Sequence, residues 1–103
     1  MRLTPGSRLR SQVCSTEVIA VRAPGADVDL RCGGEPMVDL NADIPAGRKP
    51  AAGLDTGNQI GKRYTTSQVD GLEVLVTKPG QGTLAIGAEP LAVKEAKPLP
   101  STD

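Results

Sequence analysis

The sequence has no histidine, no tryptophan and no phenylalanine, and Tyr64 is its only aromatic residue. The lack of histidine removes the side chain that most often acts as a general acid or base near neutral pH. The lack of aromatic rings removes the platforms on which bases stack, and 12 Lys and Arg against 12 Asp and Glu leave no basic surplus to hold phosphates. The composition therefore predicts that nucleic acid is not a partner.

Long apolar runs are also absent. No stretch approaches the roughly 18 apolar residues of a membrane-spanning helix, and residues 1–5 lack the apolar segment of a signal peptide. We therefore expect no membrane partner and a cytoplasmic location; the Ala, Gly, Pro and Arg usage has a bacterial character. A chain of 103 residues fits one domain. Its core must be built without large aromatic side chains, so oligomerisation would add needed stability.

One six-residue pattern occurs twice, as CGGEPM at 32–37 and as IGAEPL at 86–91. Matching residues are 54 apart within this pattern (32 to 86) and 56 apart further upstream (11 to 67). Upstream matches are Ser-Gln-Val at 11–13 and 67–69, Glu-Val-Ile at 17–19 with Glu-Val-Leu at 73–75, and Pro-Gly at 24–25 and 79–80. These matches predict an internal duplication, with repeat one at about 7–38 and repeat two at about 62–93.

Alternating apolar residues separated by turn sequences predict strands in both repeats. Gly-Gly at 33–34 and Asp-Gly at 70–71 are typical of hairpin turns, and Pro36, which lacks an N–H group, predicts an edge strand. The expected strands are 7–13, 17–22, 27–32 and 35–38, then 62–69, 72–78, 83–86 and 89–93. We predict an all-β fold, a small barrel or two-layer sandwich built from two β-hairpin repeats with pseudo-two-fold symmetry.

The rest of the chain predicts connections within a single domain spanning 1–103. Residues 39–61 contain several Pro and Gly and no sustained periodicity, so they predict a long loop. Loops of this length in compact domains are usually functional or disordered. Residues 94–103, with two prolines, predict an extended tail.

Cys14 and Cys32 are the only cysteines. Cys32 lies on the inward side of its expected strand, and its counterpart is Ile86, so we predict a small core residue. Cys14 corresponds to Asp70 in a turn, so we predict a more exposed thiol. These two positions argue against a disulfide, as does a cytoplasmic location. We expect no cofactor and no metal site, because a structural zinc site needs four Cys or His ligands and only a two-fold dimer could supply them.

Two other patterns invite a chemical interpretation that we reject. Glu35 and Glu89 form a duplicated carboxylate pair, but each follows a hairpin turn, where a solvated side chain is expected. Residues 78–83, Lys-Pro-Gly-Gln-Gly-Thr, superficially resemble a phosphate-binding loop, but they lack its Gly-Lys-Ser/Thr ending and precede a strand. Both patterns predict ordinary hairpin connections.

The expected strands 17–22 and 73–78 carry apolar residues on both faces. One face can line the core. The other, with Ile19, Val21 and Leu75, would be exposed in a monomer and is predicted to be an interface, because exposed apolar patches usually mark contact surfaces.

No nucleophile, base and orienting group can be recognised together, so we expect no catalytic residue and no enzyme activity. We hypothesise a non-catalytic small β subunit that binds another protein or itself, as a homodimer or hetero-complex, and helps to assemble or regulate that complex. The alternative is a small-molecule- or metal-binding domain that uses the cleft between the repeats, or Cys14 with Cys32.

Overall fold

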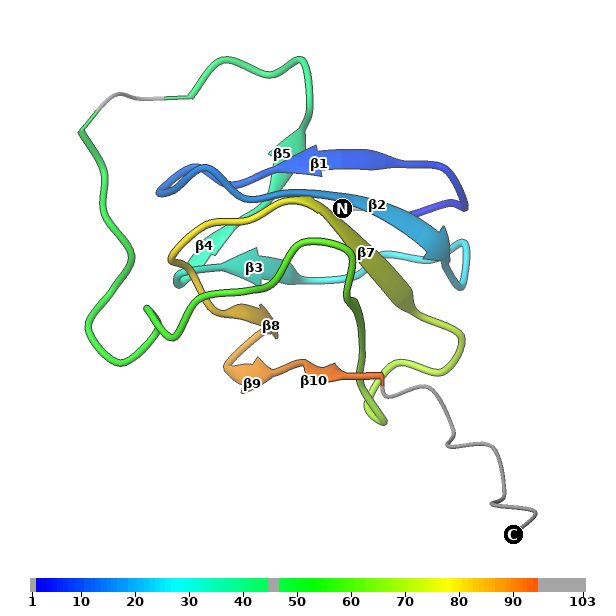
Figure 1. Cartoon of the computed structure of the whole chain (residues 1–103). Helices are drawn as coiled ribbons and strands as arrows, with labels where there is room; N and C mark the ends of the chain where they lie inside the picture. The colour runs from blue at the N-terminus through cyan, green and yellow to red at the C-terminus, as the bar shows by residue number, and fades with distance from the viewer. Residues whose placement is uncertain (1, 45–46, 95–103) are drawn as a thin grey trace, which may run out of the picture.

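The computed structural model describes residues 2–44 and 47–94, which form strands and loops and no helix (Figure 1). The prediction of an all-β fold is therefore confirmed. Nothing in these two ranges is a helix that could cross a membrane. The strands are β1 (Arg8–Arg10), β2 (Glu17–Arg22), β3 (Leu30–Cys32), β4 (Glu35–Pro36), β5 (Val38–Asp39), β6 (Arg63–Thr65), β7 (Glu73–Lys78), β8 (Leu84–Ile86), β9 (Glu89–Pro90) and β10 (Ala92–Val93).

The described strands form two antiparallel sheets. One sheet has six strands in the order β10-β6-β7-β2-β1-β5, and the other has four in the order β4-β3-β8-β9. In Figure 1, β1, β2 and β7 run across the upper part of the molecule, and β3, β8 and β9 lie below them. The central pair of each sheet, β2 with β7 and β3 with β8, joins a strand from before the long loop to one from after it.

The two long strands alternate as the sequence predicts. Val18 and Ala20 on β2 are buried, and Val74 and Val76 on β7 are buried beside them. Burying branched aliphatic side chains between sheets removes apolar surface from water, which is the main stabilising term of such a fold. Members of both sheets meet in one cluster, made of Leu3, Leu9, Val18, Ala20, Val28, Leu30, Cys32, Met37, Tyr64, Leu72, Val74, Val76, Leu84 and Leu91.

The prediction of one returning strand at the end of each repeat is wrong. Residues 35–38 split into β4, which pairs with β3, and β5, which pairs with β1 in the other sheet. The split occurs at Met37, which is 1% exposed and whose N–H donates to the Leu30 carbonyl at 2.9 Å. The chain therefore turns Met37 into the core and changes sheets there. Leu91 separates β9 from β10 in the same way, and its N–H donates to the Leu84 carbonyl at 2.9 Å.

The edge prediction for Pro36 is confirmed, because β4 is an edge strand of the four-stranded sheet. Its missing N–H group is therefore not needed by a further neighbour. Glu35 and Glu89 lie on β4 and β9, the two opposite edges of this sheet. Two strands lie between the two carboxylates, and neighbouring strands are about 4.8 Å apart. The carboxylates are therefore too far from each other to share a proton.

Apart from Asp39, which ends β5, the predicted loop 39–61 contains no strand in its described part and is nonetheless hydrogen-bonded to the body of the protein. It crosses the end where the β1–β2 loop, the β3–β4 turn and the β7–β8 loop meet (Figure 1, left). The Ala51 N–H donates to the Gly33 carbonyl at 2.9 Å, and the Leu54 carbonyl accepts from the Thr83 N–H at 2.9 Å. The predicted tail, except for Lys94, lies outside the described residues.

Candidate functional site

The sulfur atoms of Cys14 and Cys32 lie 3.7 Å apart, and both cysteines are free thiols. Cys14 is in the loop between β1 and β2 and is half-buried, whereas Cys32 ends β3 and is 0% exposed. Their environments are therefore as predicted, with Cys32 in the core and Cys14 more exposed. These positions, which were expected to argue against a disulfide, nevertheless bring the two thiols close together, because the β1–β2 loop folds over the end of β3.

Ser11 causes the β1–β2 loop to fold in this way. The predicted strand 7–13 ends at Arg10, because the Ser11 side chain takes over the hydrogen bonding of the next residues. Ser11 Oγ accepts the N–H groups of Val13 at 3.1 Å and Cys14 at 3.2 Å, and the Ser11 N–H donates to the Thr16 carbonyl at 2.9 Å. Such short side-chain-to-backbone bonds compete with the strand ladder and form a tight bend. Cys14 is consequently held at the tip of a closed loop.

Thr16 and Asn58 connect this bend to the other loops. Asn58 Nδ2 donates to Thr16 Oγ1 at 2.7 Å and to the Gly82 carbonyl at 2.9 Å, and Asn58 Oδ1 accepts the Gly80 N–H at 3.2 Å. Thr16 Oγ1 lies 3.1 Å from Cys14 Sγ. Because the Thr16 oxygen already accepts from Asn58, its own hydroxyl proton is free to be donated to the Cys14 sulfur.

Two glycines of the β7–β8 loop make room for the sulfur atoms. A Cβ atom at Gly82 would lie 2.6 Å from Cys32 Sγ and 3.2 Å from Cys14 Sγ, and one at Gly80 would lie 2.4 Å from Thr16 Oγ1 and 2.9 Å from Cys14 Sγ. Neither glycine has a positive φ angle. Glycine is therefore required here by close approach and not by backbone conformation.

The hydrogen bond between the two thiols separates their acidities. It lowers the pKa of Cys14 from 9.0 to about 4, against the raising effect of burial, and Ser11 and Thr16 lower this pKa further. The same bond and burial raise the pKa of Cys32 far above its ordinary value. The bond thus favours a thiolate on the more exposed sulfur and a proton on the buried one when the pair loses its first proton.

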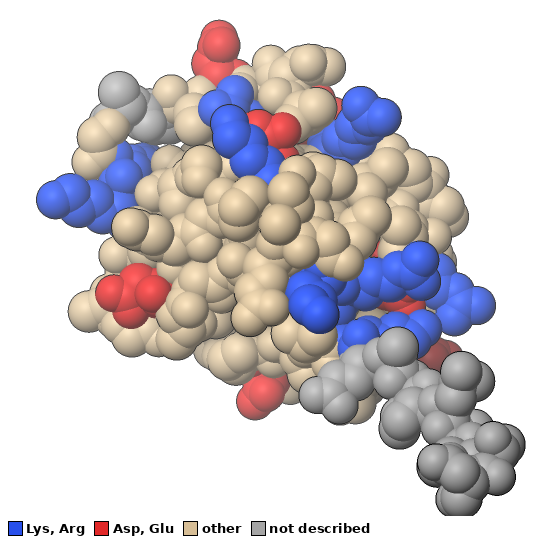
Figure 2. All heavy atoms as spheres, in the orientation of Figure 1, with Lys and Arg blue, Asp and Glu red and all other residues tan. Residues whose placement is uncertain are grey.

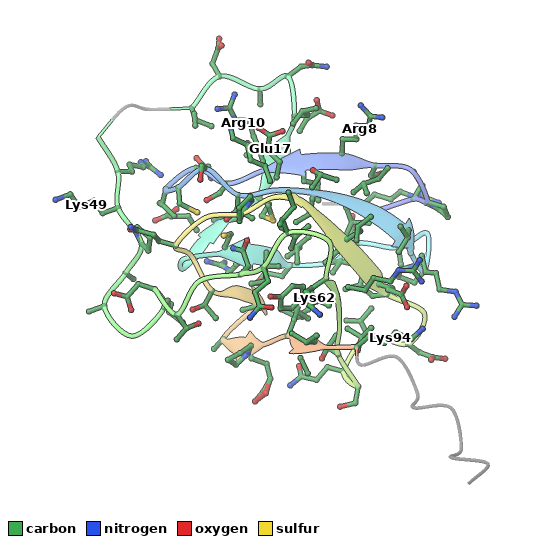
Figure 3. The ribbon with its side chains drawn as sticks, in the orientation of Figure 1. Arg8, Arg10, Glu17, Lys49, Lys62 and Lys94 are labelled. Carbon is green, nitrogen blue, oxygen red and sulfur yellow. The ribbon has the colours of Figure 1, made fainter. Side chains whose placement is uncertain are left out.

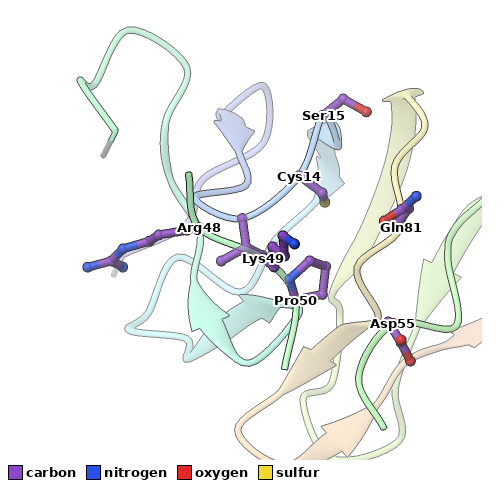
Figure 4. A pocket seen from close by; sticks show the side chains of 8 residues that line it. Cys14, Ser15, Arg48, Lys49, Pro50, Asp55 and Gln81 are labelled. Carbon is purple, nitrogen blue, oxygen red and sulfur yellow. The ribbon is translucent and has the colours of Figure 1, made fainter. Parts of the chain in front are cut away.

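Cys14 faces a surface hollow of about 510 Å³ (Figure 4). Its size is within the range of small-molecule sites. In Figure 4 the charged ends of Arg48 and Asp55 extend away from Cys14, and Arg48 pairs instead with Glu35 at 3.5 Å. The hollow is lined by Val13, Cys14, Ser15, Arg48, Lys49, Pro50, Asp55 and Gln81.

A metal ion would find few ligands at this site. Within residues 2–44 and 47–94, no three Cys, Asp or Glu side chains are grouped so as to hold a metal. The two sulfurs could contribute at most half of a tetrahedral zinc site. Redox or exchange chemistry at sulfur suits this pair better than metal binding.

The predicted interface residues lie elsewhere, on the outer face of the six-stranded sheet. Ile19 pairs across the sheet with Leu75, and both are half-buried, as is Val21 on the same strand as Ile19. Leu40 covers part of this face, because it lines with Ile19 a shallow hollow of about 210 Å³. Ile60, beside the end of β7, is 62% exposed.

Sequence reasoning missed the pairing of the thiols and the role of residues 78–83. Rejecting a phosphate-binding loop left the glycines at positions 80 and 82 unexplained. The structure shows that both are needed because the loop passes close to the sulfur atoms. A usable signal was present, because glycines beside a strand can indicate close approach of another group as well as a turn. The bend at Ser11 gives no sequence signal of its own, because Leu9, Ser11 and Val13 alternate with polar residues as a strand would, and all three are buried.

The sequence matches no protein family, and neither a curated protein nor a solved structure is significantly similar to the chain.

Proposed function

We propose that the chain is a non-catalytic β subunit that binds another protein chain, or a second copy of itself, through the outer face of its six-stranded sheet. The observation that carries this proposal is the cross-strand pair formed by Ile19 and Leu75 at the centre of that face. Both side chains are only half-buried, although they occupy the middle of the largest sheet. Covering them would remove further apolar surface from water, at about 25 cal/mol per Å² before the costs of association.

The charges around this face support a partner of definite chemistry. Uncharged atoms fill the middle of the face seen in Figure 2, and Lys and Arg lie around its border together with Asp and Glu. Figure 3 places Arg8, Arg10 and Glu17 along one side and Lys62 and Lys94 along the other. A partner surface with an apolar centre and a rim of mixed charge would complement this arrangement, since rim charges steer association and select the partner.

Sedimentation velocity at micromolar concentration tests the proposal, first on the protein alone and then with partners captured from its host. The Leu75→Lys variant places a charge in the centre of the face and is expected to weaken the dimer or complex by at least about tenfold. Ile86→Lys is a matched control, because Ile86 is also half-buried but lies on β8 of the other sheet. A monomer that captures no partner, or equal effects of the two variants, would contradict the proposal.

We further propose that the two halves arose by internal duplication and keep a pseudo-two-fold relationship. Exchanging β1–β5 for β6–β10 leaves both strand orders unchanged. Ile19 pairs with Leu75, which lies 56 residues later, and Arg31 pairs with Ala85, which lies 54 residues later. These are the separations of the sequence repeat, so each of these two residues pairs with its own counterpart. This is the pairing expected where a two-fold axis passes between two antiparallel strands. An experimental structure in which the halves superpose only by some other rotation would exclude this relationship.

A second candidate function is a small-molecule- or metal-binding domain at the hollow beside Cys14. The short distance between the two sulfurs favours it over a featureless surface. Metal analysis of the protein purified under reducing conditions distinguishes a metal-binding domain from a small-molecule-binding domain. Bound metal would also imply ligands from a second chain. A cytoplasmic location agrees with both candidates, since it keeps thiols reduced.

A further inference from the structure

The cysteine pair has the parts of a thiol–disulfide exchange site. Its sulfurs are 3.7 Å apart, and a disulfide bond of about 2.05 Å would require them to approach by about 1.7 Å. Cys14 is in a loop bend, where a small shift of the chain can supply that movement, while Cys32 is fixed at the end of β3. One sulfur can therefore move toward the other without opening the core.

The two sulfurs differ in the way that exchange requires. Cys14 is the half-exposed sulfur and borders the hollow, so an external reagent can reach it. Cys32 is 0% exposed and can be reached only through Cys14. An accessible attacking thiolate backed by a buried second thiol is the arrangement in which a mixed disulfide is resolved internally.

The surroundings hold Cys14 as a thiolate and keep the sulfurs in contact. Thr16 Oγ1, at 3.1 Å, can donate to the Cys14 sulfur, whereas Ser11 Oγ, at 3.3 Å, accepts from the Cys14 thiol when that sulfur is protonated. Gly80 and Gly82 bring the β7–β8 loop so close that no side chain fits at either position. These contacts come from three separate segments, so the site is assembled by the fold and not by one local motif.

We propose that Cys14 and Cys32 form a dithiol site that reduces low-molecular-weight disulfides and becomes an internal disulfide in doing so. The Cys14 thiolate attacks one sulfur of the small disulfide, the sulfur–sulfur bond of that molecule breaks, and the first half leaves and takes up a proton. Cys32 then loses its proton and attacks Cys14, which breaks the mixed disulfide and releases the second half as a thiol. Two protein thiols are oxidised, and one small disulfide is reduced to two thiols.

The order of these steps follows from the charge on Cys14. Its hydrogen bond and its negative charge are two of the three causes that raise the pKa of Cys32, and burial is the third. Both causes disappear once Cys14 is joined to the incoming group. Cys32 therefore becomes easier to deprotonate only after the first step, when its thiolate is needed. This proposal is independent of the protein-binding face, which lies on the outer side of β2 and β7.

The test uses the reduced full-length protein and glutathione disulfide, with acid quenching and intact-mass analysis. The wild-type protein is expected to lose roughly two daltons, the two thiol hydrogens, and to regain them with dithiothreitol. Cys32→Ser is expected to stop at the stable mixed disulfide, and Cys14→Ser is expected to react at least about tenfold more slowly. Circular dichroism shows whether each variant is folded under the same conditions.

Cys32→Ala provides a second form that stops at the mixed disulfide if the serine variant does not fold. A wild-type protein that accumulates only the mixed disulfide would overturn the proposal, because Cys32 would not resolve it. Equal reaction rates for the wild type and Cys14→Ser would overturn it too, since Cys14 would not be the attacking sulfur. The protein-binding proposal would be untouched by either result.

Discussion

A Cβ atom at Gly82 would lie 2.6 Å from the sulfur of Cys32. This Cβ atom would also lie 3.0 Å from the backbone nitrogen of Gly33, so the crowding involves main chain as well as side chain. Gly82 itself is buried, and Asn58 donates to its carbonyl oxygen at 2.9 Å. The β7–β8 loop is therefore fixed against the cysteine pair from two sides.

Gly82→Ala is accordingly expected to destabilise the protein by about 1–3 kcal/mol through overpacking. Urea unfolding measures the change in free energy. In a double-mutant cycle with Cys32→Ala, which removes the contacted sulfur, the cost of the alanine at position 82 should fall. Purely additive costs would show that the sulfur contact is not the cause.

Cys32→Ser is expected to destabilise the protein by about 1–3 kcal/mol, because it places a hydroxyl group in a fully buried position where the Cys14 sulfur is only a weak hydrogen-bond partner. Cys14→Ser is the natural comparison, since Cys14 is half-buried and already surrounded by hydroxyl groups, so its cost should be below about 1 kcal/mol. Equal unfolding midpoints for the two variants would be incompatible with the different burial of the two sulfurs.

Glu73 on β7 forms ion pairs with Arg63 on β6 and with Lys94, the residue that follows β10. Its carboxylate accepts from Lys94 Nζ at 2.8 Å and from Arg63 Nη1 at 3.3 Å, and the residue is 4% exposed. Glu73→Gln keeps the shape but removes the charge, so we expect a loss of about 1–3 kcal/mol at pH 7. Glu89→Gln, at an exposed position, should change stability by less than about 0.5 kcal/mol.

The pH dependence of that loss gives a second check on Glu73. The hydrogen bond from Lys94 lowers the pKa of the Glu73 carboxyl in the folded state. A lowered pKa stabilises the fold above the unfolded-state pKa of about 4.3, and this contribution is lost as the pH falls through the folded-state pKa. The free-energy difference between wild type and Glu73→Gln should therefore be constant near neutrality and shrink below about pH 4. A difference that persists into stronger acid would assign the effect to packing.

Much of the fold could be predicted because local signals decide it. Apolar alternation placed β2 at 17–22, where the structure has it, and Gly33 and Gly34 form the predicted turn with φ angles of 66° and 92°. The change of sheet at Met37 could not be predicted, because the alternation of inward and outward side chains continues across it: Met37 simply points into the core. Local pattern reports which face a side chain takes, but not which sheet its neighbours join.

The site could be predicted only in part, because it is made by contacts between distant segments. The burial of Cys32 followed from its position in a strand, and the exposure of Cys14 from its position in a turn. Their approach depends on the Ser11 bend and on the glycines at 80 and 82, which act through tertiary packing. No spacing of the two cysteines in the sequence encodes that geometry.

The most direct test of the paired-thiol site is the pH dependence of Cys14 alkylation in the native protein. Iodoacetamide modification, located by peptide mass spectrometry between pH 3 and pH 9, reports the thiolate fraction at each cysteine. Because the Cys32 hydrogen bond lowers the pKa of Cys14 to about 4, the Cys14 rate should reach half its maximum near that pH and then level off, while Cys32 stays unmodified. A Cys14 rate that keeps rising toward pH 9, or modification of both cysteines at one rate, would contradict the account.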